Sequence, residues 1–168
     1  MNSTDRQKPI GGRELLFHPR SNVRQVEEDV LLAPKFDERG LLPCVTTDAD
    51  SGELLMLGWM DRAALTATLR TGQAHYWSRS RGQVWPKGAT SGLVQQVVEA
   101  RIDDDQDALW LRVRVQGLGA SCHVGYRSCF YRSVPWGERV GGRLVFTETE
   151  KIFDPVEVYG DAPNPTQL

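Results

Sequence analysis

An acidic run is the first place where this chain could do chemistry. Asp103-Asp104-Asp105-Gln106-Asp107 puts four carboxylates within five residues. Side chains alternate along an extended chain, so the first, third and fifth of the run are predicted to converge on one side, with Asp104 pointing away. Three converging carboxylates suit a hard, oxygen-preferring ion such as Mg²⁺. A solvated hairpin tip would explain the same run, because charged turns are common.

Two cysteines beside a histidine form the second candidate site. Cys122 and His123 are followed by Cys129. Thiolates bind Zn²⁺ or another divalent transition metal, although this spacing is not that of a zinc finger. His123 is a candidate general base, since the usual pKa of imidazole lies near neutrality. The alternative is that both thiols are small buried core groups.

A segment rich in arginine, glycine and aromatic residues is the third candidate, as a site for a phosphorylated nucleotide. Its candidate substrate-binding residues are Arg79, Arg81, Trp85, Lys87 and Ser91. Cationic groups and hydroxyls bind phosphate, and an aromatic ring can stack on a base. An exposed basic hairpin fits the pattern equally well. A nucleic-acid surface would fit too, but the net charge of -2 argues against it.

Length and composition bound the class of protein. The 168 residues suffice for one compact domain with its own core. Three cysteines are too few for a disulfide scaffold and predict thiols or metal ligands. The polar N-terminus and the lack of a long apolar run predict a cytoplasmic protein that does not bind membranes.

Hydrophobic periodicity predicts an α+β domain with a mainly antiparallel sheet and one clear helix. Segments 41–47 and 53–59 are predicted to form a hairpin around a polar turn. Asp61 can cap the following helix, which Gly72 closes. The other predicted elements are a short helix at 23–32 and strands at 75–79, 94–102 and 109–115.

The remaining segments are predicted to be irregular. Residues 80–92 form a loop, and the acidic run occupies the tip between the last two strands. The tail around 153–165 is expected to be extended and wrapped rather than helical, because of its prolines. On the strand at 94–102, one face is expected to carry Val94, Val98, Ala100 and Ile102. Three regions follow: an N-terminal arm at 1–35, a domain at 36–135 and a C-terminal extension at 136–168.

Three stretches together resemble the phosphoribosyl-AMP cyclohydrolases of histidine biosynthesis. They are HYWSRSRGQVWPKGATSG, RIDDDQDALWLRV and GASCHVGYRSCFYR, in this order and spacing. The lead-in FDERGLLPCVTTDADSGELLMLGWM also fits that family. The resemblance covers roughly residues 36–132, most of the expected core.

The resemblance implies hydrolysis of phosphoribosyl-AMP between N1 and C6 of its adenine ring. It also implies an intertwined homodimer with Mg²⁺ and Zn²⁺ sites whose ligands come from two subunits, the segment after Tyr131 being a candidate for wrapping the partner. By position, the magnesium ligands would be Asp103, Asp105 and Asp107. Cys122 and Cys129 would be two of three zinc thiolates, with His123 as proton shuttle. We expect the two substrate phosphates to be held by Arg79, Arg81 and Lys87.

The sequence departs from the family at one metal ligand. The family motif reads Asp-Cys-Asp-x-Asp, and Asp104 stands where its cysteine belongs. Asp104 could itself ligate, giving a harder site that favours Fe²⁺, Mn²⁺ or Co²⁺ over zinc. Alternatively the site is crippled, or Cys44 replaces the missing ligand. Smaller departures are Ala89, Leu93 and Val124, where the family usually has Glu, Asn and Thr.

Three functions therefore remain open. The first is an active cyclohydrolase with an altered metal site. The second is a hydrolase or deaminase of the same fold acting on another purine nucleotide. The third is a paralogue that binds metal or nucleotide without turnover.

Overall fold

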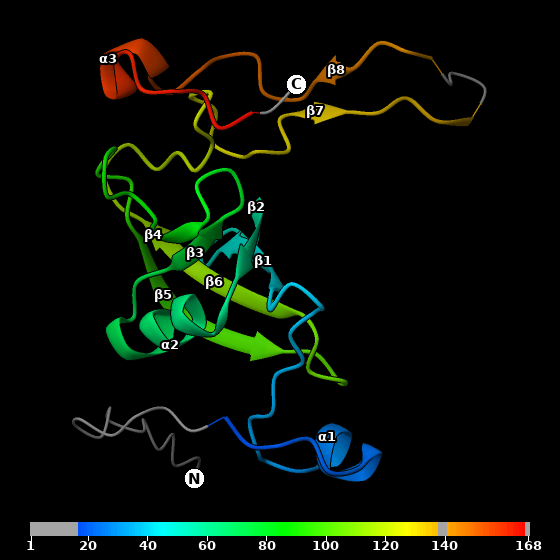
Figure 1. Cartoon of the computed structure of the whole chain (residues 1–168). Coiled ribbons are helices and arrows are strands. Elements are labelled where there is room, and N and C mark those ends of the chain that lie inside the picture. The colour runs from blue at the N-terminus through cyan, green and yellow to red at the C-terminus, as the bar shows by residue number, and fades with distance from the viewer. Residues whose placement is uncertain (1–16, 138–140, 167–168) are drawn as a thin grey trace, which may run out of the picture.

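A four-stranded sheet in the order β2-β1-β6-β5 forms the centre of the fold (Figure 1). The computed structural model describes residues 17–137 and 141–166. The sheet strands are β1 Leu42–Asp48, β2 Leu54–Met60, β5 Gln95–Ile102 and β6 Leu109–Val115. β1 pairs antiparallel with β2, and β5 with β6, whereas β1 and β6 run parallel. The predicted α+β class and mainly antiparallel sheet are confirmed.

The predicted central helix is confirmed as α2 (Arg62–Thr71). The Asp61 carboxylate accepts a hydrogen bond from the Ala64 amide at 2.7 Å, and Gly72 ends the helix at a φ of 69°. Leu65 is buried in the core between α2 and the sheet. The short N-terminal helix α1 (Val23–Glu28) ends earlier than predicted.

A small hairpin lies beside the main sheet. It consists of β3 (His75–Ser78) and β4 (Gln83–Pro86). β3 was predicted, but β4 lies in the segment expected to be irregular. Val84 and Trp85 of β4 pack against the core, so tertiary contact makes a strand of a segment with little periodicity of its own.

The prediction of which residues share one face of β5 is wrong. The pairing register of β5 on β6 shifts between Val97 and Glu99, which marks a bulge. Val97 therefore packs against the core, while the Val98 residue is 47% exposed and Ala100 is also exposed. Beyond the bulge the alternation resumes in the opposite phase, so Ala100 and Ile102 lie opposite the buried Leu111 and Leu109, and Ile102 contacts the core as expected.

The C-terminal part extends from one end of the sheet, opposite the N-terminal segment (Figure 1). β7 (Arg132–Ser133) and β8 (Val145–Phe146) form a two-stranded arm. The helix α3 (Pro155–Tyr159) follows, so the expectation of a wholly non-helical tail is wrong. Pro155 fits because it occupies the first turn, where no amide is required, and Asp154 caps that turn. Within 17–137 and 141–166, no helix is long and apolar enough to cross a membrane.

Candidate active site

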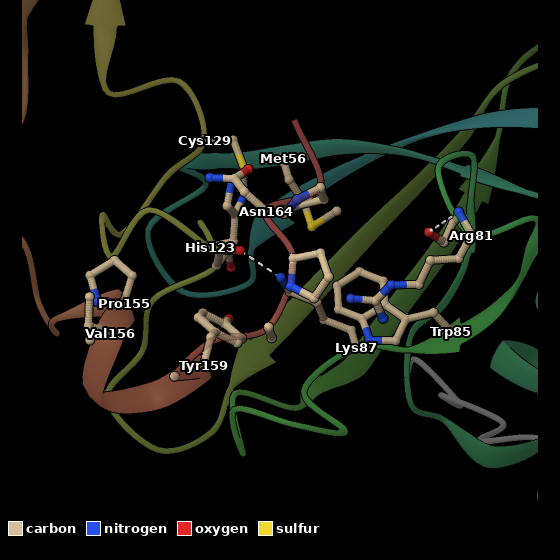
Figure 2. A pocket seen from close by; sticks show the side chains of 16 residues that line it. Met56, Arg81, Trp85, Lys87, His123, Cys129, Pro155, Val156, Tyr159 and Asn164 are labelled. Atoms are coloured by element: carbon tan, nitrogen blue, oxygen red, sulfur yellow. Dashed lines mark hydrogen bonds between the residues drawn. The ribbon is translucent and has the colours of Figure 1, made fainter. Parts of the chain in front are cut away.

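A cavity of ≈ 330 Å³ lies where the β3–β4 hairpin, the loop after β6 and the C-terminal segment meet (Figure 2). Side chains far apart in the sequence line it, and those of chemical interest are Arg81, Trp85, Lys87, His123, Cys129 and Asn164. Its size is at the lower end of the range for small-molecule sites. The C-terminal wall, including Tyr159 and Asn164, was not predicted, because nothing in the local sequence indicates which surface a tail covers.

The two cysteines of the second motif are brought together by the loop that follows β6. The thiol of Cys129 hydrogen-bonds to Cys122, which lowers the pKa of Cys122 to about 6 and raises that of Cys129. The backbone amides of Val124 and Tyr126 and the ammonium of Lys87 lower the Cys122 pKa further. One thiolate beside one thiol, inside a partly desolvated loop, suits a soft or borderline divalent ion.

Lys87 belongs to the wall of the cavity rather than to an exposed basic surface. The residue is only 6% exposed, and Nζ donates a hydrogen bond to the Ser121 carbonyl at 2.6 Å. Nζ also lies 5.0 Å from the centre of the Trp85 ring. Burial lowers the pKa of Lys87, and electrostatic attraction to the cysteine pair opposes that change. Lys87 therefore holds the cysteine loop as well as bringing a positive charge into the cavity.

His123 has the properties of a neutral base. Burial lowers its pKa, the nearby Lys87 charge lowers it further, and a hydrogen bond with the Asn164 side chain opposes both. Within the described part of the chain, Nε2 is buried and has no hydrogen-bond partner. A neutral imidazole with an unpaired nitrogen can accept a proton or bind a ligand.

A buried polar chain connects the sheet to this loop. The Tyr76 hydroxyl lies 2.7 Å from Thr46 Oγ1 and donates to Gln95 Oε1 at 2.8 Å. Gln95 Nε2 donates in turn to Ser121 Oγ at 3.2 Å. A Cβ at Gly58 would lie 2.6 Å from the Tyr76 ring, so only glycine leaves room for it. The chain fixes Ser121, and with it the start of the cysteine loop.

The remaining predicted substrate-binding residues do not all reach the cavity. Arg81 and Trp85 line it. The Arg79 guanidinium lies 5.5 Å from the centre of the Trp59 ring, and Arg79 is not among the lining residues. Ser91 is also outside the lining, and its hydroxyl accepts a hydrogen bond from a backbone amide two residues later.

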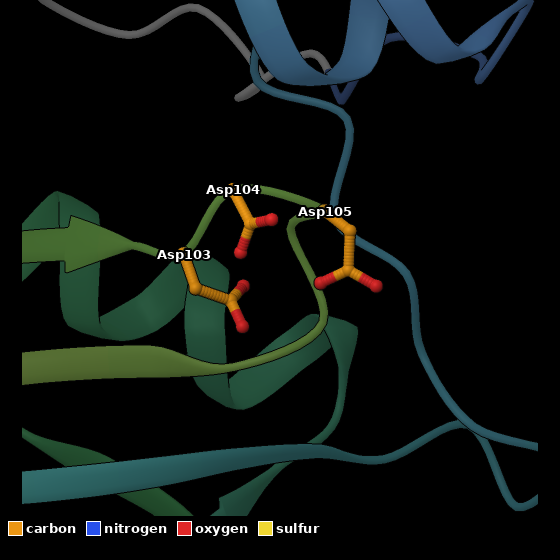
Figure 3. Close-up of side chains that lie close together, drawn as sticks. All are labelled: Asp103, Asp104 and Asp105. Atoms are coloured by element: carbon orange, nitrogen blue, oxygen red, sulfur yellow. The ribbon is translucent and has the colours of Figure 1, made fainter.

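The acidic run forms a tight cluster at the tip of the β5–β6 hairpin (Figure 3). One ligand oxygen from each of Asp103, Asp104 and Asp105 lies within 4.8 Å of the others. The expected alternation is wrong, because the run is a turn in which Gln106 has a φ of 59°. Asp107 instead faces Lys35, with 3.4 Å between the charged atoms.

The acidic run and the cysteine pair lie at opposite ends of β6. That strand has 7 residues, and at roughly 3.3 Å per residue the two ends are about 20 Å apart. A single ion therefore cannot contact both Asp104 and Cys122 of one chain. Cys44 offers no substitute ligand, since it is buried in the core, where desolvation raises the pKa of its thiol to about 12.

Titration of the metal-free protein should reveal the shared proton of the cysteine pair. We expect thiolate absorbance near 240 nm to rise with an apparent pKa of about 6, because Cys122 is deprotonated while Cys129 keeps its proton. Cys129→Ala should raise that pKa, because it removes the donor that hydrogen-bonds to the Cys122 thiolate. Absorbance that first appears near the ordinary cysteine pKa, about 8.5, would contradict this arrangement.

Comparison with known proteins gives one consistent result. The family model described as phosphoribosyl-AMP cyclohydrolase matches residues 56–131. The phosphoribosyl-AMP cyclohydrolase of Nitrobacter winogradskyi is 52% identical over 135 residues, covering 80% of this chain and 92% of the relative. That of Rhizobium etli strain CIAT 652 is 49% identical over 149 residues, covering 87% and 97%. The chain belongs to the phosphoribosyl-AMP cyclohydrolase family.

Proposed function

We propose that this chain hydrolyses phosphoribosyl-AMP in histidine biosynthesis, opening the adenine ring between N1 and C6. The observation that carries the proposal is the cavity, where His123, Lys87 and Cys129 with its partner Cys122 behind it come together in a chain about half identical to named cyclohydrolases. Of the two alternatives, a hydrolase or deaminase acting on another purine nucleotide differs from it in what the same cavity would accept. A paralogue that binds metal or nucleotide differs in lacking turnover.

Two kinds of metal ion would bind the two ligand groups. The thiolate and thiol of Cys122 and Cys129 fit Zn²⁺ or another divalent transition metal. The carboxylates of Asp103, Asp105 and Asp107 are the hard oxygen ligands that Mg²⁺ prefers. A carboxylate from Asp104 in place of the family's third thiolate would make the first site harder. When bound, such an ion would supply hydroxide at neutral pH, because it would lower the pKa of a water molecule to about seven.

The chain's own groups would bind and orient the substrate. Neutral His123 can take the proton released at the attacking oxygen, since burial and Lys87 both keep its pKa low. Arg81 and Lys87 bring positive charge for phosphate, and Trp85 offers a ring for the base. The wall contributed by α3 and the residues up to Pro165 would exclude water from the reacting ring.

A homodimer would bring the two separated ligand groups together. In one chain they lie at opposite ends of β6, a strand about 20 Å long, so a shared ion needs Asp104 from one subunit and the cysteines from the other. The arm after the cysteine loop has the exposed apolar side chains that a subunit contact would cover: Phe130 is 52%, Trp136 86% and Phe146 51% exposed. We assign the dimer contact to this arm.

One departure from the family, Leu93, has a structural role that does not require a loss of activity. Leu93 is 3% exposed and packs with Ala120 and Phe153. Its apolar side chain therefore anchors the C-terminal extension over the cavity. Ala89 is exposed and forms no such contact. Asp104 is the departure that falls on a proposed metal ligand, and the choice between an active enzyme and a non-catalytic paralogue depends on it.

Metal reconstitution tests the function directly. Ring opening of phosphoribosyl-AMP is measured with stripped protein given Zn²⁺, Fe²⁺, Mn²⁺ or Co²⁺, each with Mg²⁺. We expect turnover by the wild type, with Asp104→Cys shifting the preference towards Zn²⁺ because it adds a soft ligand. Asp104→Ala is the control, because it removes the carboxylate without adding a soft ligand. No turnover by the wild type with any metal, together with activity in Asp104→Cys, would mean that this chain no longer catalyses the reaction.

A further inference from the structure

The N-terminal segment, residues 17–35, holds the acidic run through one buried side chain. Gln106 is 4% exposed although it lies at a hairpin tip. Its Oε1 accepts a hydrogen bond from the Ala33 amide at 2.7 Å. Its Nε2 donates to the carbonyls of Val26 at 2.9 Å and Leu31 at 3.2 Å. The Gln106 carbonyl also accepts from the Lys35 amide at 2.7 Å.

A second side chain ties the same two segments. Arg20 Nη1 donates to the Ala33 carbonyl and Nη2 to the Asp105 carbonyl, both at 2.7 Å. One guanidinium thus bridges the N-terminal segment and the backbone of a carboxylate residue in the cluster. Because these bonds are made to backbone atoms, they fix the course of the main chain rather than one rotamer.

The shape of the run depends on these bonds. Gln106 adopts a φ of 59°, which is uncommon for a residue other than glycine. Inside the turn, Asp103 Oδ1 accepts from the amides of Asp107 and Ala108, each at 2.9 Å. Those two bonds close the turn but leave the Gln106 side chain unpaired. Among the described residues, each hydrogen-bond partner of this side chain comes from the N-terminal segment, and a buried amide without them would be unfavourable.

The same segment places a cation beside the carboxylates. Lys35 Nζ lies 3.4 Å from Asp107 Oδ2 and 4.0 Å from Asp105 Oδ2. These are two of the carboxylates to which the proposed function assigns Mg²⁺. The ammonium therefore offsets the repulsion between them and competes with any divalent ion for them.

We propose that residues 17–35 act as a clamp that fixes the acidic run in its metal-binding shape, with Gln106 as the positioning residue and Lys35 lowering the affinity for a divalent cation. The inference rests on the proposed function for the identity of the ion alone. The positioning itself is a property of the metal-free chain. The clamp gives residues 17–35, which lie outside the region 56–131 that the family model matches, a role in the site.

Two measurements on the full chain test this clamp. Mg²⁺ binding to stripped protein is followed by calorimetry, and amide hydrogen exchange of residues 103–108 is measured without metal. Gln106→Asn keeps an amide and tolerates a positive φ but is too short to reach its partners. Lys35→Met removes the competing charge. Arg24→Met is the matched control, since Arg24 lies in the same segment and pairs with Glu28 instead.

Gln106→Asn is expected to weaken Mg²⁺ binding about tenfold and to speed exchange at Asp107 and Ala108 by at least about tenfold. Lys35→Met should tighten binding about two- to fivefold, and Arg24→Met should leave it unchanged. Exchange in β1 should stay at the wild-type rate in every variant, which shows that the fold is intact.

Wild-type exchange and affinity in Gln106→Asn would overturn the clamp, and unchanged or weaker binding in Lys35→Met would overturn the role of Lys35. A wild type that binds no Mg²⁺ would instead overturn the magnesium site of the proposed function. The exchange measurement would still decide for or against the clamp, because it is made without metal.

Discussion

Cys122→Ser is expected to lower kcat/KM for phosphoribosyl-AMP by at least about a thousandfold, because it removes a proposed metal ligand rather than a group that supports one. Of the two cysteines, Cys122 is the one whose thiol is kept deprotonated by its surroundings, with a pKa of about 6. Serine has nearly the same shape, but its hydroxyl stays protonated at neutral pH. The bound transition metal should fall in parallel, measured by elemental analysis of the purified protein.

Cys44→Ala is the matched control for that substitution. Cys44 is also a buried cysteine, but it lies on β1 in the core and its thiol pKa is raised rather than lowered. Its loss should reduce the melting temperature while metal content and kcat/KM stay within a fewfold of wild type. Retention of metal and of more than a tenth of the activity in Cys122→Ser would exclude Cys122 as a ligand.

Lys87→Met is expected to lower kcat/KM about a hundredfold and to change its pH dependence. After burial, the Lys87 charge is the second cause of the low pKa of His123. Without it the pKa of His123 rises, so the imidazole becomes protonated at higher pH. The acidic limb of the pH profile should therefore move to higher pH, measured from initial rates between about pH 5 and 9.

An exposed cation on the sheet provides the control for Lys87. Arg101 pairs with Glu99 on the outer face of β5, and Arg101→Met should leave both rate and profile unchanged. A Lys87→Met enzyme with a lower rate but an unshifted acidic limb would show that Lys87 acts only through the loop at Ser121. A wild-type rate would remove Lys87 from the site.

Local sequence predicted those parts of the fold that local chemistry decides. α2 has a capping carboxylate at Asp61 and a closing Gly72, and the first hairpin has a polar turn, so each boundary depends on neighbouring residues. The parallel pairing of β1 with β6, the bulge in β5 and the strand β4 depend on partners far along the chain. No periodicity in one segment contains that information.

The same distinction between local and long-range contacts decides which parts of the candidate site could be predicted. The proximity of Cys122 and Cys129 could be predicted, because one loop carries both. The cover given by α3 and the clamp given by residues 17–35 could not, because they join segments separated by about 30 to 80 positions. The cover does so mainly through apolar contacts and the clamp through hydrogen bonds, and neither has a sequence signature. Gln106 looked like a spacer between acids, yet its side chain is among the most buried polar groups described.

The claim that two subunits share one metal site can be tested by complementation. Asp104→Ala and Cys122→Ser proteins, each inactive alone, are unfolded, mixed in equal amounts and refolded together with metal. If the site is shared, each mixed dimer contains one site with both Asp104 and Cys122 intact, and about a quarter of wild-type activity should return. If each chain holds a complete site, every site in the mixture lacks a ligand. Activity that stays at the level of the separate variants would then contradict the account.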